Sequence, residues 1–136
     1  ADWHPFPVTM PTSLVLALRA ALRSLLREGV EARRARLQHM ADHLRGALTD
    51  MGLPLFVPAE QMAATITAAY CPEGVRSTTI RDYVLREQNL QITTGFGPFK
   101  EQVIRIGHMG GAVSDDHIND LIIALRAFMA EQSVKG

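Results

Sequence analysis

The sequence is poor in several residue types, and each shortage excludes a class of protein. It contains one cysteine in 136 residues, Cys71, so no disulfide can form within the chain, and a reducing cytoplasmic location is expected. No apolar run is long enough for a membrane-spanning helix. Basic and acidic side chains balance at 14 each, so the net charge gives no reason to expect binding to nucleic acid.

The remaining composition is that of an ordinary globular domain. Apolar residues make up 47% of the chain and charged residues 21%, and the length suffices for one compact domain. His39 and His43 lie four residues apart on an expected helix, with Asp42 beside His43. The sequence suggests no further ligand for the two histidines, so we expect no metal site. The arginines of residues 27–36 alternate with glutamates, which indicates a solvated helix face.

Apolar periodicity and breaker residues predict the elements. Three prolines favour an extended arm over residues 1–11, and Thr12 or Ser13 would cap a helix behind it. Gly29 either separates two helices or bends one long helix that reaches Met51, with Gly52 just past its end. The later segments include extended pieces at 55–57, 64–70, 90–93 and 103–107, and a loop over 94–100. A helix over 77–89 would be capped by Ser77 or Thr78, and Ser114 would cap a last helix that frays from Gln132.

This order of elements predicts an α+β fold with a small, mainly antiparallel sheet and helices packed on it. Two consecutive strands, 90–93 and 103–107, break the strict alternation that a parallel doubly wound sheet requires. The inward positions of the helices are apolar residues at helical spacing, which are Leu14, Leu18, Leu22, Leu25, Val30, Leu37, Met40, Ala41, Leu44, Leu48, Ile80, Val84, Leu85, Ile118, Leu121, Ile122, Leu125 and Phe128.

One strand carries a charge among apolar residues. Val103, Ile104 and Ile106 favour an extended, half-buried segment, and Arg105 stands between them. A charge in such a place is costly unless a partner is near, and a guanidinium suits a planar partner with two oxygens. Arg105 is therefore a candidate receptor for a carboxylate or phosphate. The alternative is an ion pair with an Asp or Glu of the same chain.

The segment Arg105-Ile106-Gly107-His108-Met109-Gly110 resembles the C-terminal signature of class V aminotransferases, in particular the alanine–glyoxylate and serine–pyruvate group. Further segments resemble the same family in the same order, namely His4-Pro5-Phe6-Pro7-Val8-Thr9, residues 17–22 and 28–31, Gly52-Leu53-Pro54-Leu55-Phe56-Val57, and Gly95-Phe96-Gly97. These are fold-type I enzymes that use pyridoxal 5'-phosphate.

The resemblance implies the layout of the family's small C-terminal domain, in a fragment of a longer enzyme whose domain covers residues 12–136. It implies that Arg105 binds the α-carboxylate of a small amino acid such as alanine or serine, with glyoxylate or pyruvate as the 2-oxo acid. In the family the Schiff-base lysine and most cofactor contacts lie upstream. The lysines here are Lys100 and Lys135, so we expect no catalytic residue in this chain and no activity from it alone.

The resemblance also bears on the remaining candidates. It implies that residues 95–97, Gly95, Phe96 and Gly97, form a pocket wall, and that the arm lies at a homodimer interface near the partner's cofactor phosphate. Relatives carry a hydroxyl residue there, whereas this chain has His4 beside Pro5, so His4 is either a cofactor and interface residue or a surface histidine. A packing role is expected for Cys71. Two other functions remain open, a stand-alone module that binds small carboxylates and a dimerisation domain without catalysis.

Overall fold

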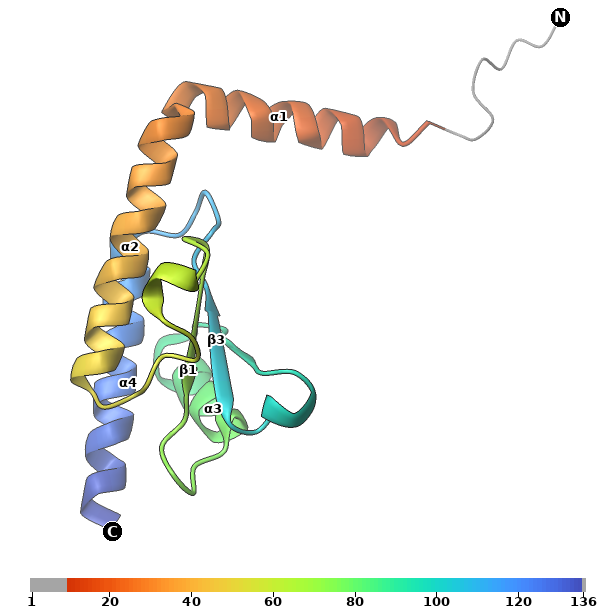
Figure 1. Ribbon diagram of the computed structural model, residues 1–136. Helices are drawn as coiled ribbons and strands as arrows, with labels where there is room; N and C mark the ends of the chain where they lie inside the picture. Colours follow the sequence, from red (N-terminus) through yellow and green to blue (C-terminus); the bar gives the residue numbers. More distant parts are fainter. Residues whose placement is uncertain (1–9, 136) are drawn as a thin grey trace, which may run out of the picture. The chain divides into compact units, whose positions relative to one another are not determined.

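A computed structural model describes residues 10–135, so His4 and most of the expected arm lie outside the described part. The chain divides into two units, one up to Ala35 and one from Arg36 onwards, and each is described by itself. The elements in chain order (Figure 1) are α1 (Thr12–Glu28), α2 (Val30–Asp50), the 3-10 turn η1 (Ala59–Gln61), β1 (Ile66–Tyr70), α3 (Ser77–Gln88), β2 (Thr93–Thr94), the 3-10 turn η2 (Gly97–Phe99), β3 (Val103–Gly107) and α4 (Asp115–Lys135).

The first unit consists of α1 and the start of α2. Gly29 separates the two helices with φ +88°, a value that suits glycine, and its N–H donates to the Leu25 carbonyl. The two-helix alternative is therefore confirmed. The expected hydroxyl cap at Thr12 or Ser13 is wrong, because Pro11 occupies the N-cap position and Thr12 Oγ1 donates back to the Met10 carbonyl.

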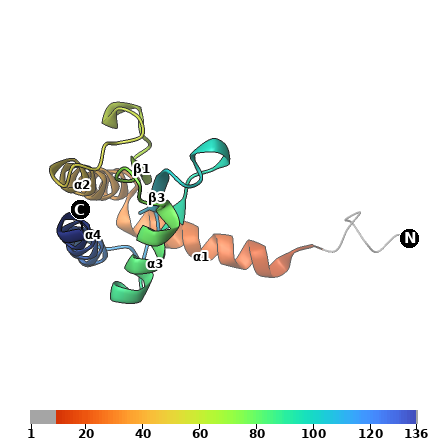
Figure 2. The same cartoon turned by 90° about the horizontal axis from the view of Figure 1, so that it is seen from below.

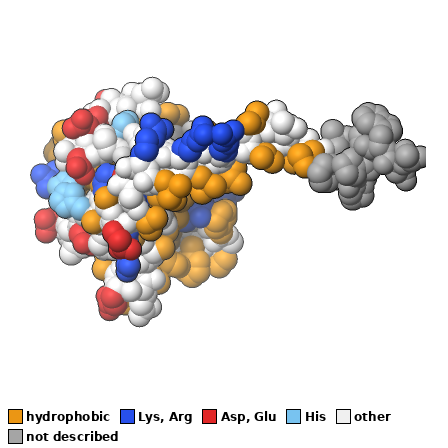
Figure 3. Space-filling model, turned by 90° about the horizontal axis from the view of Figure 1, so that it is seen from above, with side chains coloured by type: hydrophobic (Ala, Val, Ile, Leu, Met, Phe, Trp, Pro, Cys, Tyr) orange, Lys and Arg blue, Asp and Glu red, His pale blue; other side chains and the backbone are white. Residues whose placement is uncertain are grey.

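The apolar stripe of α1 lies exposed. None of the residues of α1 is buried, although the spacing of its leucines predicted an inward face. Figure 3 shows apolar side chains gathered along one edge of this helix and arginines along another. The exposed apolar residues are Leu14, Val15, Leu16, Leu18, Leu22 and Leu26, and Val30 at the start of α2 is 57% exposed as well. The stripe was predicted correctly, but nothing within this unit covers it.

The second unit is built around a three-stranded antiparallel sheet with the order β1-β3-β2. Strand β3 is central, and its Arg105 is opposite Ala68 of β1 and Thr93 of β2. The predicted strand over 90–93 is wrong in its bounds, because β2 pairs only at Thr93 and Thr94 while Ile92 turns into the core. The predicted α+β class with a small antiparallel sheet is confirmed.

The strand predicted over 64–70 begins two residues late, at Ile66. Just before the strand the chain forms a turn, and Arg45 Nη2 donates there to the carbonyls of Ala63 and Ile66 at 2.8 and 3.2 Å. The expected short extended piece at 55–57 is present as an isolated bridge, in which Leu55 lies opposite Ala69.

The two faces of the sheet differ sharply. Thr67 and Ala69 of β1 pair with Ile106 and Ile104 of β3, and all four side chains are buried on the face that carries the helices. Helices α2 and α4 lie side by side on this face in both ribbon views (Figures 1 and 2), and His43 of α2 is hydrogen-bonded to Asn119 of α4 at 2.9 Å. Because side chains alternate along a strand, Arg105 lies on the opposite face.

Helix ends and inward positions agree with the sequence in part. Gly52 has φ +74°, and the N–H groups of Gly52 and Leu53 donate to Thr49 and Leu48, so the helix end predicted there is confirmed as a Schellman motif. The α4 stripe and the α2 residues from Met40 to Leu48 form the core. The buried apolar residues that pack together in this core are Met40, Leu44, Ala47, Leu48, Leu53, Ala69, Ile80, Tyr83, Val84, Ile92, Ile104, Ile106, Ile118, Leu121, Ile122, Ala124, Leu125 and Phe128.

Three local predictions in α3 and α4 are wrong. Leu85 is 45% exposed, and Tyr83 is buried in its place, because its ring packs against Phe128 and its hydroxyl donates to Glu131. Ser77 does not cap α3, since it is the first helical residue and its hydroxyl donates to the Lys100 carbonyl. Helix α4 continues to Lys135, beyond the predicted fraying point. None of the described helices combines the length and apolarity needed to cross a membrane.

Candidate functional site

Arg105 stands at the middle of β3, on the face of the sheet away from the helices. Its Nε–H donates to the Thr94 carbonyl at 2.9 Å, and its guanidinium carbon lies 3.7 Å from the centre of the Phe96 ring. A cation over an aromatic face at this distance is attracted by the ring electrons. The guanidinium is thus held along one edge and on one face.

No Asp or Glu in the described part of the chain forms an ion pair with Arg105. The alternative that this arginine is paired with an acid of its own chain is therefore wrong for residues 10–135. Only its Nε takes part in a hydrogen bond there, so both terminal nitrogens remain as donors. Two parallel N–H groups on a fixed guanidinium match the oxygens of one carboxylate.

A cavity of about 160 Å³ opens beside this guanidinium. Its wall is aromatic and aliphatic apart from the arginine, and it is lined by Phe56, Ala68, Gly95, Phe96, Phe99, Val103 and Arg105. The Phe56 and Phe99 rings meet edge to face with centres 5.0 Å apart, which stiffens the wall. Of the expected wall residues, Gly95 and Phe96 line this cavity and Gly97 does not.

The loop that carries Phe96 is tightly fixed. The N–H of Gly95 donates to the Val103 carbonyl at 2.7 Å, and a Cβ added at Gly95 would meet the Phe99 carbonyl oxygen at 2.4 Å. Only glycine allows this close approach of two backbones. Past Phe96, the N–H groups of Phe99 and Lys100 return to the carbonyls of Phe96 and Gly97. The backbone on both sides of Phe96 is therefore held by the turn η2 and by β3.

Behind the sheet lies a buried polar cluster that the sequence analysis did not identify. Arg45 is 4% exposed, and its guanidinium donates to the carbonyls of Ala59, Ala63 and Ile66 and to Thr67 Oγ1. Arg45 occurs at the helical spacing of the inward residues of α2, so its place in the apolar stripe was the signal that could have revealed it.

The same cluster contains His108, which is fully buried. Its ring atom Nε2 lies 3.0 Å from Thr67 Oγ1, and its backbone N–H donates to the Thr65 carbonyl. Burial, and secondarily the positive charge of Arg45, lower the pKa of His108 from its ordinary value. Thr67 Oγ1 also accepts from Arg45, so one hydroxyl links the guanidinium to Nε2 of the ring, whose other nitrogen is Nδ1. That Nδ1 has no hydrogen-bond partner in the described structure.

The other candidates are placed as follows. Cys71 packs against the core, and burial, together with the charge of Glu101, raises the pKa of its thiol to about 11, so the thiol stays protonated. His43 is engaged with Asn119. The described residues contain no group of three His, Cys, Asp or Glu side chains that could hold a metal ion. His4 lies outside the described residues.

Comparison with known proteins identifies the fold and the family. No protein-family model matches the chain. The alanine–glyoxylate aminotransferase of Oryctolagus cuniculus is 35% identical over 120 residues, which are 87% of this chain and 30% of that protein. The crystal structure of the alanine–glyoxylate aminotransferase from Nostoc sp. superposes with a TM-score of 0.82 at 31% identity, covering 93% of this chain and 34% of that one. The chain belongs to the class V, fold-type I aminotransferase family.

Other similar proteins vary in their described activity. Pyridoxamine–pyruvate aminotransferase from Mesorhizobium loti has a TM-score of 0.80 at 31% identity, over 91% of this chain and 33% of that one. The soluble hydrogenase small subunit of a Synechococcus strain is 34% identical over 94% of this chain and 33% of that protein. This class V aminotransferase domain spans about a third of the length of the curated relatives that it matches.

The described residues do not by themselves fit pyridoxal phosphate. The aldehyde of this cofactor needs a lysine amine, preferably in a closed, apolar site. Lys100 is exposed at the end of η2, and no lysine lines the cavity beside Arg105. The side chain of Lys135 is outside the described set.

Proposed function

We propose that this domain binds the α-carboxylate of the substrate in a longer, pyridoxal-phosphate-dependent aminotransferase. The enzyme would move an amino group between alanine or serine and a 2-oxo acid such as glyoxylate or pyruvate. The observation that carries the proposal is the state of Arg105, a guanidinium fixed by the Thr94 carbonyl and the Phe96 ring with both terminal nitrogens open to a carboxylate.

The size and lining of the adjoining cavity support a small substrate. At about 30 Å³ for each water in the liquid, 160 Å³ corresponds to roughly five waters, which suits a ligand of about five or six heavy atoms. Alanine, glyoxylate and pyruvate are of this size. Several relatives are described as acting with glyoxylate or pyruvate, which agrees with this substrate class.

In this proposal Arg105 does the work of binding and orientation. Two charge-assisted hydrogen bonds from its terminal nitrogens would fix the carboxylate plane, and the aromatic wall would keep water from the remainder of the substrate. Pyridoxal phosphate, held by parts of the enzyme outside the described residues, would supply the electron sink for carbanion chemistry. The described residues would contribute no proton-transferring group.

We also propose that the intact enzyme is a cytoplasmic homodimer in which residues 1–11 contribute to the interface. A proline-rich arm forms little core of its own, so its contacts are more readily made with a partner. Deleting the arm should weaken self-association in sedimentation experiments and leave the melting temperature nearly unchanged. An unchanged oligomeric state with a large loss of melting temperature would contradict this.

The carboxylate assignment is tested with Arg105→Lys in the longer enzyme that carries this domain. Lysine keeps the charge but loses the two-pronged donor geometry. We expect kcat/KM for alanine to fall by about two to three decades, which corresponds to roughly 2–4 kcal/mol of lost transition-state binding. For ethylamine, which is alanine without its carboxylate, kcat/KM should change little.

A matched control is Arg81→Lys, because Arg81 is a partly exposed helical arginine on α3 whose ion pair in the described structure is with its neighbour Asp82. This change should leave both rates unaltered. Equal losses for alanine and ethylamine in the Arg105 variant would mean that this residue supports the fold or the cofactor. An unchanged alanine rate would refute the carboxylate assignment.

A further inference from the structure

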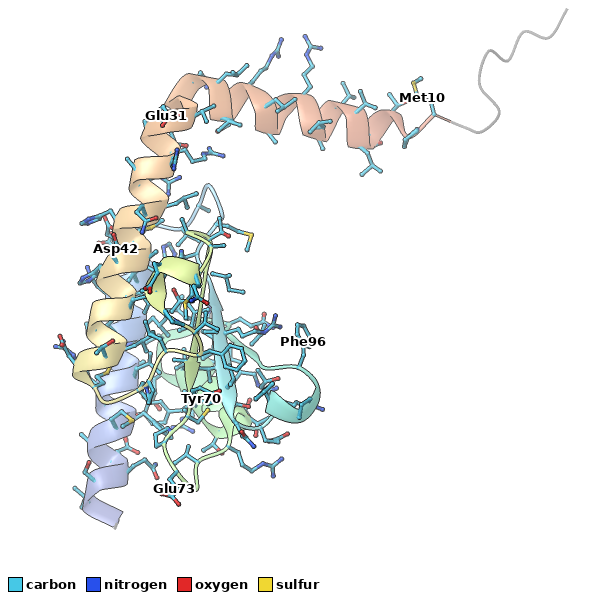
Figure 4. The ribbon with its side chains drawn as sticks, viewed as in Figure 1. Met10, Glu31, Asp42, Tyr70, Glu73 and Phe96 are labelled. Atoms are coloured by element: carbon cyan, nitrogen blue, oxygen red, sulfur yellow. The ribbon has the colours of Figure 1, made fainter. Side chains whose placement is uncertain are left out.

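An exposed aromatic ring on a fixed loop needs an explanation. The side chain of Phe96 is 71% exposed, yet the backbone around it is held by hydrogen bonds from both η2 and β3. Figure 4 shows this side chain on the loop beside β3. Phe56 and Phe99, the other phenylalanines of the cavity, pack against each other, whereas the ring of Phe96 lies against the guanidinium of Arg105.

The contacts of Arg105 restrict how it can hold a carboxylate. A guanidinium offers two edges for bidentate binding, one with Nε and a terminal nitrogen, the other with both terminal nitrogens. The single Nε hydrogen is used by the Thr94 carbonyl at 2.9 Å, which removes the first edge. The ring of Phe96, 3.7 Å from the guanidinium carbon, then covers one face and limits rotation out of plane.

We propose that Phe96 is a positioning residue, which together with the Thr94 carbonyl presents Arg105 for end-on binding of a carboxylate through its two terminal nitrogens. This inference rests on the proposed function of Arg105. The ring of Phe96 lies against the guanidinium, so in this proposal it acts on carboxylate binding through the arginine. Its ring supplies a preformed orientation that the flexible arginine side chain would otherwise have to adopt on binding.

Two substitutions distinguish the effect of the aromatic ring from the effect of an apolar side chain alone. Phe96→Leu keeps an apolar side chain but removes the π face, and Phe96→Tyr keeps the ring. Because Phe96 is largely exposed, both variants should fold with an unchanged melting temperature. In the longer enzyme, Phe96→Leu should raise KM for alanine by about threefold to tenfold with kcat changed by less than about twofold, the range expected for one lost cation–π contact.

Phe96→Tyr should retain the wild-type KM, and Phe96→Leu should lose less with ethylamine than with alanine, because ethylamine has no carboxylate for the arginine to bind. A second measurement needs no activity and uses the 136-residue chain itself. Protons above a ring face are shielded, so the Arg105 Nε–H resonance should move downfield in Phe96→Leu and stay near its wild-type position in Phe96→Tyr.

The outcomes distinguish this inference from the proposed function. If Arg105→Lys raises KM for alanine while Phe96→Leu does not, the carboxylate assignment stands and the positioning role of Phe96 is refuted. Equal losses for alanine and ethylamine in Phe96→Leu would also refute it, because the ring would then contact another part of the reacting complex. If neither Arg105→Lys nor Phe96→Leu affects alanine, both proposals fail together.

Discussion

Arg45 is a buried cation whose described hydrogen-bond partners are all neutral. Its guanidinium binds three backbone carbonyls and one hydroxyl, and no carboxylate is among these partners. Arg45→Met retains the length of the side chain and removes every donor. The carbonyls of Ala59, Ala63 and Ile66 would then lose their bonds to the guanidinium, and the turn that leads into β1 would keep only its backbone bonds, from Met62 N–H to Ala59 and from Ile66 N–H to Ala63.

The size of the effect follows from two opposing terms. Hydrogen bonds to a charged donor contribute about 1.5–3 kcal/mol each, whereas burial of the charge itself costs several kcal/mol, which the substitution returns. With four bonds lost and part of the carbonyl surface regaining water, we expect Arg45→Met to lower the free energy of unfolding by about 2–4 kcal/mol. The free energy of unfolding of Arg45→Lys should lie between those of the wild type and Arg45→Met, because an ammonium has three donors for four acceptors.

Urea unfolding followed by circular dichroism gives the measurement, with an unchanged m value as the sign that the denatured state is not altered. Arg126→Met is the matched control, since Arg126 is an exposed arginine within α4, and it should change stability by less than about 0.5 kcal/mol. If Arg45→Met behaves like Arg126→Met, the carbonyls do not depend on the guanidinium. A more stable Arg45→Met variant would mean that charge burial outweighs the hydrogen bonds, and the reasoning would be refuted.

Three further predictions concern other parts of the domain. Gly95→Ala should lower stability by about 1–3 kcal/mol, because its Cβ meets the Phe99 carbonyl oxygen, whereas Gly46→Ala within α2 has open space and should add up to about 1 kcal/mol in the same urea assay. The pKa of His108 is lowered in the fold, so below about pH 6.5 the unfolded chain binds the proton more readily and stability falls as the pH drops, by at most about 1.4 kcal/mol per pH unit. His108→Gln should reduce this slope in melts between pH 7 and pH 5, and an unchanged slope would contradict the assignment. Borohydride reduction of the isolated chain with pyridoxal phosphate should give no site-specific adduct, and stoichiometric labelling of Lys100 alone would overturn that expectation.

The sequence predicted those features that depend on local pattern. The inward stripe of α4 and the strand around Arg105 follow from periodicity and residue type, and the helix end at Gly52 follows from the conformational freedom of glycine. The bounds of β2 did not follow, because they depend on how the chain returns from α3 to the sheet. Side-chain contacts over long sequence separations, such as Arg45 with Ile66, have no local signature.

The candidate site shows the same division. Arg105 was identified from a charge within an apolar strand. Gly95, Phe96 and Gly97 were expected on a pocket wall, and the cavity beside Arg105 is lined by the first two and not by Gly97. The sequence could not predict that the Phe96 ring covers the guanidinium. It also could not predict that Arg105 Nε donates to the Thr94 carbonyl. Both contacts depend on the exact path of the loop between β2 and β3, and hence on the close approach of Gly95 to the Phe99 carbonyl.

The strand order also has a kinetic consequence. In the described sheet β3 lies between β1 and β2, yet it is the last of the three strands to be synthesised. Tyr70 of β1 can pair with β3 only after Val103 has been synthesised. Until then the described β2 has no strand partner and β1 has only the bridge at Leu55, and contacts between residues so far apart in sequence form slowly. The guanidinium of Arg105 is placed by the same late event. Folding of this domain and assembly of its carboxylate site should therefore share one rate-limiting step.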